Sequence, residues 1–235
     1  MNLVILREED FLDAGRARLS GRRLRHVTEV HRAAPGDELT VGLLGGAMGR
    51  GRVTRLDAEA LELEVALDRQ PPPKLPLTLV LALPRPKVLN RVLAAATSLG
   101  AARIYLVNAW KVEKSYWRSP RLAEDNLLLQ RILGLEQARD TLLPELHLRR
   151  LLRPFAEDEL PALLQGTTAL LAHPGSDAPC PRSVQGPLTL VIGPEGGFID
   201  AEIDLLGRSG CRPVHLGARI LRVETAVAAL VGRLC

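Results

Sequence analysis

Three short segments in the C-terminal half combine residues that can do chemistry with glycines that expose the backbone. Ala-His-Pro-Gly occupies 172–175, Gly-Pro-Glu-Gly-Gly-Phe occupies 193–198, and Leu-Gly-Ala-Arg-Ile-Leu-Arg-Val-Glu-Thr-Ala occupies 216–226. Glycine reaches positive φ angles and lets a ligand approach backbone amides directly. The segments also carry an imidazole, a carboxylate, and an arginine with a second carboxylate. We therefore treat them together as one candidate ligand site.

The glycine-rich segment 193–198 differs from the loops that bind phosphate. A Walker loop requires Gly-Lys-Ser/Thr and a dinucleotide fingerprint requires Gly-x-Gly-x-x-Gly, and neither occurs here. Glu195 would repel a phosphate, whereas it can accept hydrogen bonds from a ribose, an amine or the amides of its own loop. This composition disfavours an oxidoreductase that uses nicotinamide. His173 is open to two interpretations, a catalytic base or a structural histidine at the end of a strand.

Metal chemistry is disfavoured by the cysteine and histidine spacing. Cys180, Cys211 and Cys235 are too far apart for a Cys-x-x-Cys pair, and no histidine completes a familiar zinc spacing. We expect neither a metal nor a disulfide.

The candidate segments follow apolar runs that are typical of buried strands, at 168–172, 188–192 and 214–216. From residue 77 onward such runs alternate with helical patterns, which predicts an α/β fold with a largely parallel sheet. Ser119-Pro120 has the form of a helix start and predicts a long helix to about residue 138. Ligands of parallel sheets bind beyond the carboxyl ends of the strands, where the three segments lie.

The N-terminal third has a different pattern. Residues 39–67 contain apolar residues in alternation with polar ones, which predicts strands in a small, mostly antiparallel barrel or sheet. Pro71-Pro72-Pro73 then forms a stiff spacer. We place a domain boundary there, with one domain at 1–70 and a second at 71–235.

Positive charge is concentrated in two islands, although the formal net charge is only +4. Six arginines and two histidines lie within 16–32, opposed by Glu29 alone. Eight basic residues lie within 85–121, a stretch that also holds every Trp and Tyr of the chain. Basic residues interleaved with aromatics suit RNA, with its phosphates and exposed bases. The alternative is that the arginines face water and the aromatics serve the core.

The overall composition indicates a globular protein rather than a disordered or membrane-spanning one. Hydrophobic residues make up 46% and charged residues 25% of the chain. No apolar run approaches the ~20 residues that cross a bilayer, and the N-terminus does not have the pattern of a signal peptide. We expect a cytoplasmic protein.

The ordered motifs around His173-Pro174, at 193–198 and at 216–226 resemble the SPOUT, or trefoil-knot, RNA methyltransferases, and within them the RsmE-like branch. This resemblance implies a knotted, mostly parallel sheet with helices on both faces, preceded by a PUA-like β-barrel at 1–70 that binds RNA. It implies S-adenosylmethionine as cofactor, a homodimer, and methylation of N3 of a uridine in 16S ribosomal RNA of the small subunit. Another target nucleotide or RNA, or a catalytically silent RNA-binding or ribosome-assembly factor, are the alternatives.

The same resemblance assigns roles to individual residues. The cofactor is expected at Leu171, His173, Pro174, Gly193, Glu195, Gly197, Leu216, Ile220, Leu221 and Thr225. Arg222 and Glu224 are expected to be catalytic, Glu224 either as a base or only as a carboxylate at a helix start. RNA contacts are expected at Arg7, Arg22, Arg23, Arg25, Arg32, Lys111, Lys114 and Arg118. The chain departs from the family pattern at Ala218, at Val223 and at Ala94-Ala95.

Overall fold

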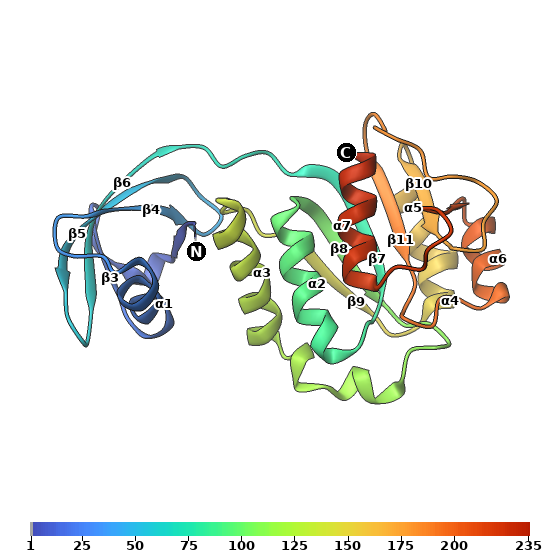
Figure 1. Cartoon of the computed structure of the whole chain (residues 1–235), viewed down its shortest axis with the longest axis horizontal. Coiled ribbons are helices and arrows are strands. Elements are labelled where there is room, and N and C mark those ends of the chain that lie inside the picture. The colour runs from blue at the N-terminus through green and yellow to red at the C-terminus, as the bar shows by residue number, and fades with distance from the viewer. Residues whose placement is uncertain (1) are drawn as a thin grey trace. The chain divides into compact units, whose positions relative to one another are not determined.

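The computed structural model describes residues 2–235 and divides into two compact units (Figure 1). The first unit comprises residues up to Pro73 together with 132–143. The second unit comprises 74–131 and 144–235. The helix α3 (Glu124–Ala138) therefore begins in the second unit and ends in the first.

The first unit is a curled, mixed sheet of six strands in the order β1-β4-β5-β6-β3-β2. Strand β1 is parallel to β4, and all other pairs are antiparallel. The predicted PUA-like barrel is not confirmed, because β1 and β2 stand at opposite edges of an open sheet. The elements are β1 (Val4–Leu6), η1 (Glu8–Asp10), β2 (Phe11–Asp13), β3 (Arg16–Leu19), α1 (Gly21–His26), η2 (Val27–His31), β4 (Glu38–Leu43), β5 (Met48–Leu56) and β6 (Leu61–Arg69).

Alternation in the sequence explains these strands, since every second side chain faces one core. That core is made of aliphatic residues such as Val41, Val53, Leu61 and Leu63, all nearly inaccessible to water. Gly49 permits the closest approach of two strands, because a Cβ there would lie 1.8 Å from the carbonyl oxygen of Ala66.

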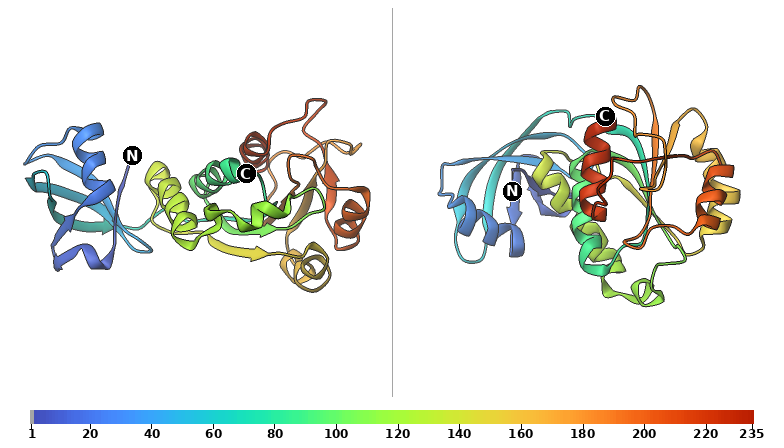
Figure 2. Two further views of the ribbon diagram at one scale, coloured as in Figure 1. Left: turned by 90° about the horizontal axis from the view of Figure 1, so that it is seen from below. Right: turned by 45° about the vertical axis from the view of Figure 1, so that its right-hand side comes forward.

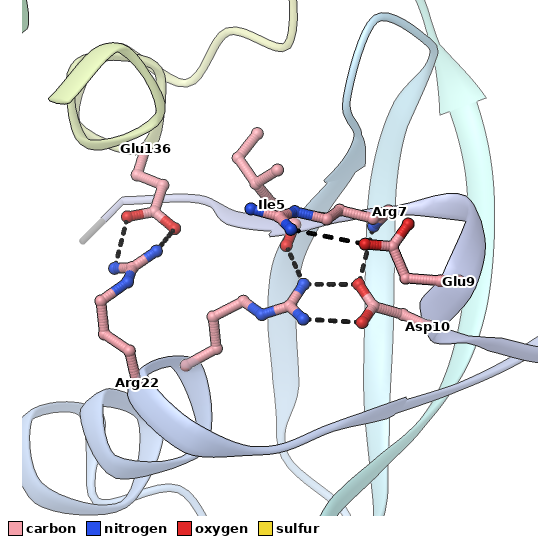
Figure 3. A network of polar contacts seen from close by, with 7 residues as sticks. Ile5, Arg7, Glu9, Asp10, Arg22 and Glu136 are labelled. Carbon is pink, nitrogen blue, oxygen red and sulfur yellow. Dashed lines mark hydrogen bonds and ion pairs between the residues drawn. The ribbon is translucent and has the colours of Figure 1, made fainter. Parts of the chain in front are cut away.

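Residues 132–143 complete the first unit through polar contacts (Figure 3). The carboxylate of Glu136 accepts two hydrogen bonds from the guanidinium of Arg22, at 2.8 and 2.9 Å. The backbone amide of Asn2 also donates to the carbonyl oxygen of Glu136, and the amide of Gly45 donates to that of Thr141. The end of α3 is thus part of the folded first unit rather than a linker.

The second unit is a six-stranded sheet in the order β12-β10-β11-β7-β8-β9, and every pair in it is parallel. Helices α2 and α7 lie side by side over one face, and α4, α5 and α6 lie over the other (Figure 2). This confirms the predicted α/β class. The elements are β7 (Leu75–Ala82), α2 (Pro86–Ser98), β8 (Ala101–Val107), η3 (Lys114–Arg118), η4 (Pro120–Leu122), α3, β9 (Glu145–Arg149), α4 (Leu152–Pro154), η5 (Phe155–Glu159), α5 (Leu160–Leu164), β10 (Thr168–Ala172), β11 (Leu188–Ile192), α6 (Asp200–Arg208), β12 (Arg212–Val214) and α7 (Val223–Leu234).

The helix predicted from Ser119 onward begins later than expected. The Ser119 hydroxyl does accept a hydrogen bond from the Arg121 amide, but it caps only the short turn η4. Ala123 then adopts an extended conformation, and the helix α3 starts at Glu124. The Ser119-Pro120 pattern therefore marks the start of the short turn η4 and not the start of the helix α3.

The connection between β10 and β11, residues 173–187, bonds to two later parts of the chain. The Cys180 amide donates to the carbonyl oxygen of His215, just after β12, at 2.8 Å. The Val184 amide donates to the carbonyl oxygen of Leu234, at the end of α7, at 2.7 Å. The connection 173–187 therefore contacts the chain just before and just after the segment 216–233.

Candidate functional site

A cavity of about 1120 Å³ lies where the three candidate segments meet in the second unit. The segments follow β10, β11 and β12, so the cavity sits beyond the carboxyl ends of parallel strands, as expected for this class of sheet. The first turns of α2 and α7 complete the wall. This volume is slightly above the range of roughly 300–1000 Å³ that is typical of ligand cavities, so the cavity has room for a nucleoside-sized organic ligand.

Glycine leaves open space along this wall at two positions. Gly197 and Gly217 both line the cavity, and both have φ in the left-handed region, at 69° and 119°. Apart from its chain neighbours, no heavy atom lies within 4 Å of the place where a Cβ would stand at either residue. The backbone is therefore bare at these two points of the wall.

The glycine-rich segment is held by groups from other elements. One carboxylate oxygen of Glu195 accepts a hydrogen bond of 3.0 Å from the amide of Arg85, at the start of α2. The ammonium group of Lys111, which lies in the loop after β8, donates to the carbonyl oxygen of Gly196 at 2.8 Å. The segment is thus fixed on both sides, which keeps its open face in place for a ligand.

Glu224 forms an ion pair with a residue that sequence reasoning did not single out. Nη2 of Arg91, on α2, lies 3.2 Å from Oε1 of Glu224, in the first turn of α7. Arg222 is not the partner of this carboxylate, because its side chain makes no hydrogen bond or ion pair within residues 2–235. The Arg222 guanidinium is exposed and available to a ligand.

The wall of the cavity is strongly basic. Two carboxylates, Glu195 and Glu224, are outnumbered by six basic side chains, namely Arg85, Lys87, Arg91, Lys111, Arg219 and Arg222. His173 and His215 also line it. Such a surface attracts a polyanion and holds it near the cavity. No group of His, Cys, Asp and Glu side chains in the described chain is placed to hold a metal ion.

Comparisons with known proteins point to one family. The sequence pattern of the RNA methyltransferase domain matches residues 71–235. The ribosomal RNA small subunit methyltransferase E of Treponema pallidum is 32% identical over 242 residues, which cover 97% of this chain and 88% of that protein. The protein of that name from Synechocystis is 30% identical, over 88% of this chain and 69% of its own. The chain belongs to the RsmE-like RNA methyltransferases.

Solved structures agree with this RsmE-like assignment at the level of the fold. The methyltransferase E of Neisseria gonorrhoeae, a structure with bound S-adenosyl methionine, superposes with a TM-score of 0.76 at 23% identity. The superposition covers 98% of this chain and 95% of that one. A methyltransferase of Legionella pneumophila with bound cofactor superposes with a TM-score of 0.74 at 24% identity and similar coverage.

The structure gathers most of the residues expected in an RsmE-like site. Of the set predicted for cofactor and catalysis, the cavity is lined by His173, Pro174, Gly193, Glu195, Gly197, Leu216, Ile220, Leu221, Arg222 and Glu224. Two do not line it. Leu171 is fully buried inside β10, and Thr225 is exposed on α7 next to Glu224. Sequence reasoning missed Arg85, Lys87 and Arg91 as wall residues, although all three belong to the basic stretch 85–121.

The residues predicted to contact RNA fall into three groups in this RsmE-like chain. Arg22 pairs with Glu136 inside the first unit (Figure 3). Arg23 donates to both oxygens of Asp10 and to the carbonyl oxygen of Ile5. The guanidinium groups of Arg22 and Arg23 therefore stabilise the folded first unit. Arg7 is half-buried and contacts Glu9 weakly, at 3.4 Å. The others are exposed, at Arg25, Arg32, Lys111, Lys114 and Arg118.

Proposed function

We propose that this chain transfers the methyl group of S-adenosylmethionine to N3 of a uridine in 16S ribosomal RNA of the small subunit. The observation that carries the proposal is the meeting of three strand-end segments around one basic cavity in a chain of this family. Because its substrate would be ribosomal RNA, we place the protein in the cytoplasm.

The residues of the cavity fit S-adenosylmethionine. The bare backbone at Gly197 and Gly217 forms a cradle that any side chain would fill. Leu216, Ile220 and Leu221 offer an apolar surface to an adenine ring, and carboxylates suit ribose hydroxyls and cationic groups. In the proposal the ligand is surrounded directly by His173, Pro174, Gly193, Glu195 and Gly197. Leu171 packs behind the cavity wall, and Thr225 lies next to Glu224 on α7.

When bound, the cofactor supplies an electrophilic methyl group. A uridine N3 becomes a good nucleophile only when its proton leaves and negative charge spreads to the neighbouring carbonyl oxygens. Arg222 carries an exposed, unpaired fork at the start of α7, and we assign it the stabilisation of that charge. Oε1 of Glu224 accepts a hydrogen bond from Arg91, whereas the other carboxylate oxygen has no protein partner within residues 2–235. We assign to this second oxygen the role of proton acceptor.

The proposal includes the knot and the homodimer. Support for the knot comes from the connection 173–187, which bonds to the chain both before and after the segment 216–233. A dimer contact on α7 has to use exposed positions such as Ala229, because Leu230 is fully buried within the chain. Light scattering at micromolar concentration should give roughly twice the chain mass. A stable and active monomer would refute the dimer.

The proposal also assigns RNA binding to the N-terminal domain at 1–70 and methyl transfer to 71–235. Arg25 and Arg32 are the exposed arginines of the first basic island that we retain as RNA contacts. Replacing both by Ala should weaken RNA binding and reduce its salt dependence, while the affinity for S-adenosylmethionine stays unchanged.

The decisive experiment maps the modified nucleotides of 16S ribosomal RNA by mass spectrometry in cells with and without this gene. Loss of one methyluridine in the deletion, restored by the purified protein with labelled S-adenosylmethionine, is the expected result. A different lost nucleotide would redirect the assignment of the target. An unchanged map, together with no binding of the cofactor by calorimetry, would refute the proposed activity.

A further inference from the structure

Trp110 is the exposed aromatic residue of the basic stretch 85–121. Its side chain is 79% exposed. The other three aromatics of that stretch are placed differently. Tyr105 is buried, the indole N–H of Trp117 donates to the side-chain oxygen of Asn108 at 2.8 Å, and Tyr116 lines the cavity. Trp110 therefore presents an apolar ring to water at a position where folding does not use it.

The backbone beneath this indole is fixed. The Trp110 amide donates a 2.7 Å hydrogen bond to Oε1 of Glu202, a carboxylate in a residue that is only 9% exposed. The other oxygen of Glu202 accepts from the Ile199 amide and caps α6. Trp110 is thus held at the end of a well-anchored loop and requires little ordering on binding.

The anchored loop also reaches the cavity. Lys111, the next residue, lines the cavity and donates to the carbonyl oxygen of Gly196. Its aliphatic chain lies along the glycine-rich segment, since a Cβ on Gly196 would be 3.0 Å from Cδ of Lys111. Trp110 itself does not line the cavity. Its backbone therefore stands one residue outside the wall, next to the basic residue Lys111.

We propose that Trp110 is a stacking platform for an unpaired RNA base that flanks the nucleotide entering the cavity. The inference rests on the proposed function and names a contact of the same site with its substrate. Single-stranded nucleic acids are bound by basic grooves together with aromatic rings on which bases stack. Here the six basic residues of the wall supply the first part and Trp110 supplies the second.

Charge favours RNA over a second copy of this chain as the occupant. A second copy would bring the same excess of arginine and lysine to the contact, and like charges repel. RNA brings phosphates to the basic wall of the cavity and an apolar ring face to the indole, so that both features are complemented at once. Self-association through Trp110 is nevertheless a distinct outcome of the test below.

The two tryptophans of the chain allow a matched fluorescence experiment. In Trp117→Phe the only indole is Trp110, and in Trp110→Phe it is Trp117. We expect a short single-stranded oligouridylate to quench the emission of Trp117→Phe and to leave that of Trp110→Phe nearly unchanged, although both variants bind it. Equal quenching in the two variants, or none in Trp117→Phe at saturating oligonucleotide, would overturn the inference.

Steady-state kinetics supply the second arm. Trp110→Ala should raise the KM for ribosomal RNA by roughly 5- to 150-fold, the range found for the loss of one stacked base. Trp110→Tyr should restore most of it, and the affinity for S-adenosylmethionine should not change. A normal KM in Trp110→Ala would refute the inference while the parent protein still methylates RNA. A mass that falls from dimer to monomer in that variant would assign the indole to self-association instead. An inactive parent protein would refute the proposed function itself.

Discussion

Removing the guanidinium of Arg22 should destabilise the first unit. Its partner Glu136 has a side chain that is only 3% exposed, whereas that of Arg22 is 37% exposed. Arg22→Ala would leave the Glu136 carboxylate buried without its counter-ion, a change that typically costs roughly 3–5 kcal/mol. Because water reaches one side of the Arg22 fork, we expect the lower end of that range, about 3 kcal/mol.

The exposed pair Arg50–Glu38 is the matched control. Its side chains are 73% and 58% exposed, and such pairs contribute roughly 0–1 kcal/mol. Arg50→Ala should therefore leave the stability nearly unchanged. Replacing Arg22 and Glu136 together by Met should recover much of the loss, because a buried ion pair exchanged for apolar residues is often neutral.

The assay has to report on the first unit alone. Trp110 and Trp117 both lie in the second unit, so tryptophan fluorescence does not follow the unfolding of interest. Hydrogen exchange of the amides in β1 and β4, measured against urea, gives the required free energy of opening. If Arg22→Ala kept its stability within about 1 kcal/mol and instead lost affinity for RNA, the structural role of Arg22 would be wrong and the RNA contact right.

Three further predictions concern the cavity and the first unit. Arg222→Ala should lower kcat for methyl transfer roughly 100- to 1000-fold with little change in RNA affinity, as for a lost oxyanion donor, and a near-normal kcat in single-turnover assays would remove Arg222 from the chemistry. Gly197→Ala should reduce the rise in melting temperature caused by S-adenosylmethionine, because φ is 69° there and a Cβ would enter the cradle. Gly207→Ala, within α6, should instead be neutral or slightly stabilising, and equal ligand shifts in both variants would contradict the cradle. Burial lowers the pKa of the His26 imidazole below its usual 6.5, so the unfolded chain binds the proton more readily and stability should fall as the pH drops below about 6.5. Hydrogen exchange of the first unit at pH 7 and pH 5 checks this, and His26→Leu should show a flatter dependence than the parent.

The candidate site was largely predictable because its residues are consecutive within short segments. Glycine followed by a carboxylate after a buried strand indicates a binding loop at any position in the sheet. Parallel strands then bring such loops together, because their carboxyl ends lie at one edge. The motifs at 193–198 and 216–226 therefore identified the cavity before its geometry was known. Leu171 and Thr225 do not line the cavity, since a strand residue next to a binding segment can face the core and a helix residue can face water instead of the ligand.

Long-range pairing was not predictable in the same way. Arg91 and Glu224 are separated by 133 positions, and Arg22 and Glu136 by 114. A cluster of arginines has the same appearance in the sequence whether its forks face RNA, water or a buried carboxylate. Only the fold decides which carboxylate reaches which arginine, so the sequence could not show that Arg22 and Arg23, both predicted to contact RNA, pair with Glu136 and Asp10.

The PUA-like barrel that the family resemblance implies at 1–70 is not confirmed, and the residue pattern alone left open whether the strands form a barrel or a sheet. Alternating residues in 39–67 indicate strands with one buried face, but they contain no information on whether the outer strands meet. Here β1 pairs in parallel with β4 and β2 ends the other edge.

The position of residues 132–143 in the chain also determines when the first unit can finish folding during synthesis. The first unit needs Glu136 and Thr141, which are synthesised about 70 residues after Pro73. At a synthesis rate of about 5–20 residues per second, the N-terminal strands precede their partner residues 132–143 by roughly 4–14 s. During that interval Arg22 lacks its carboxylate. Nascent chains arrested between residues 73 and 143 should therefore be protease-sensitive near the N-terminus, and those released after residue 143 has left the exit tunnel should be protected there.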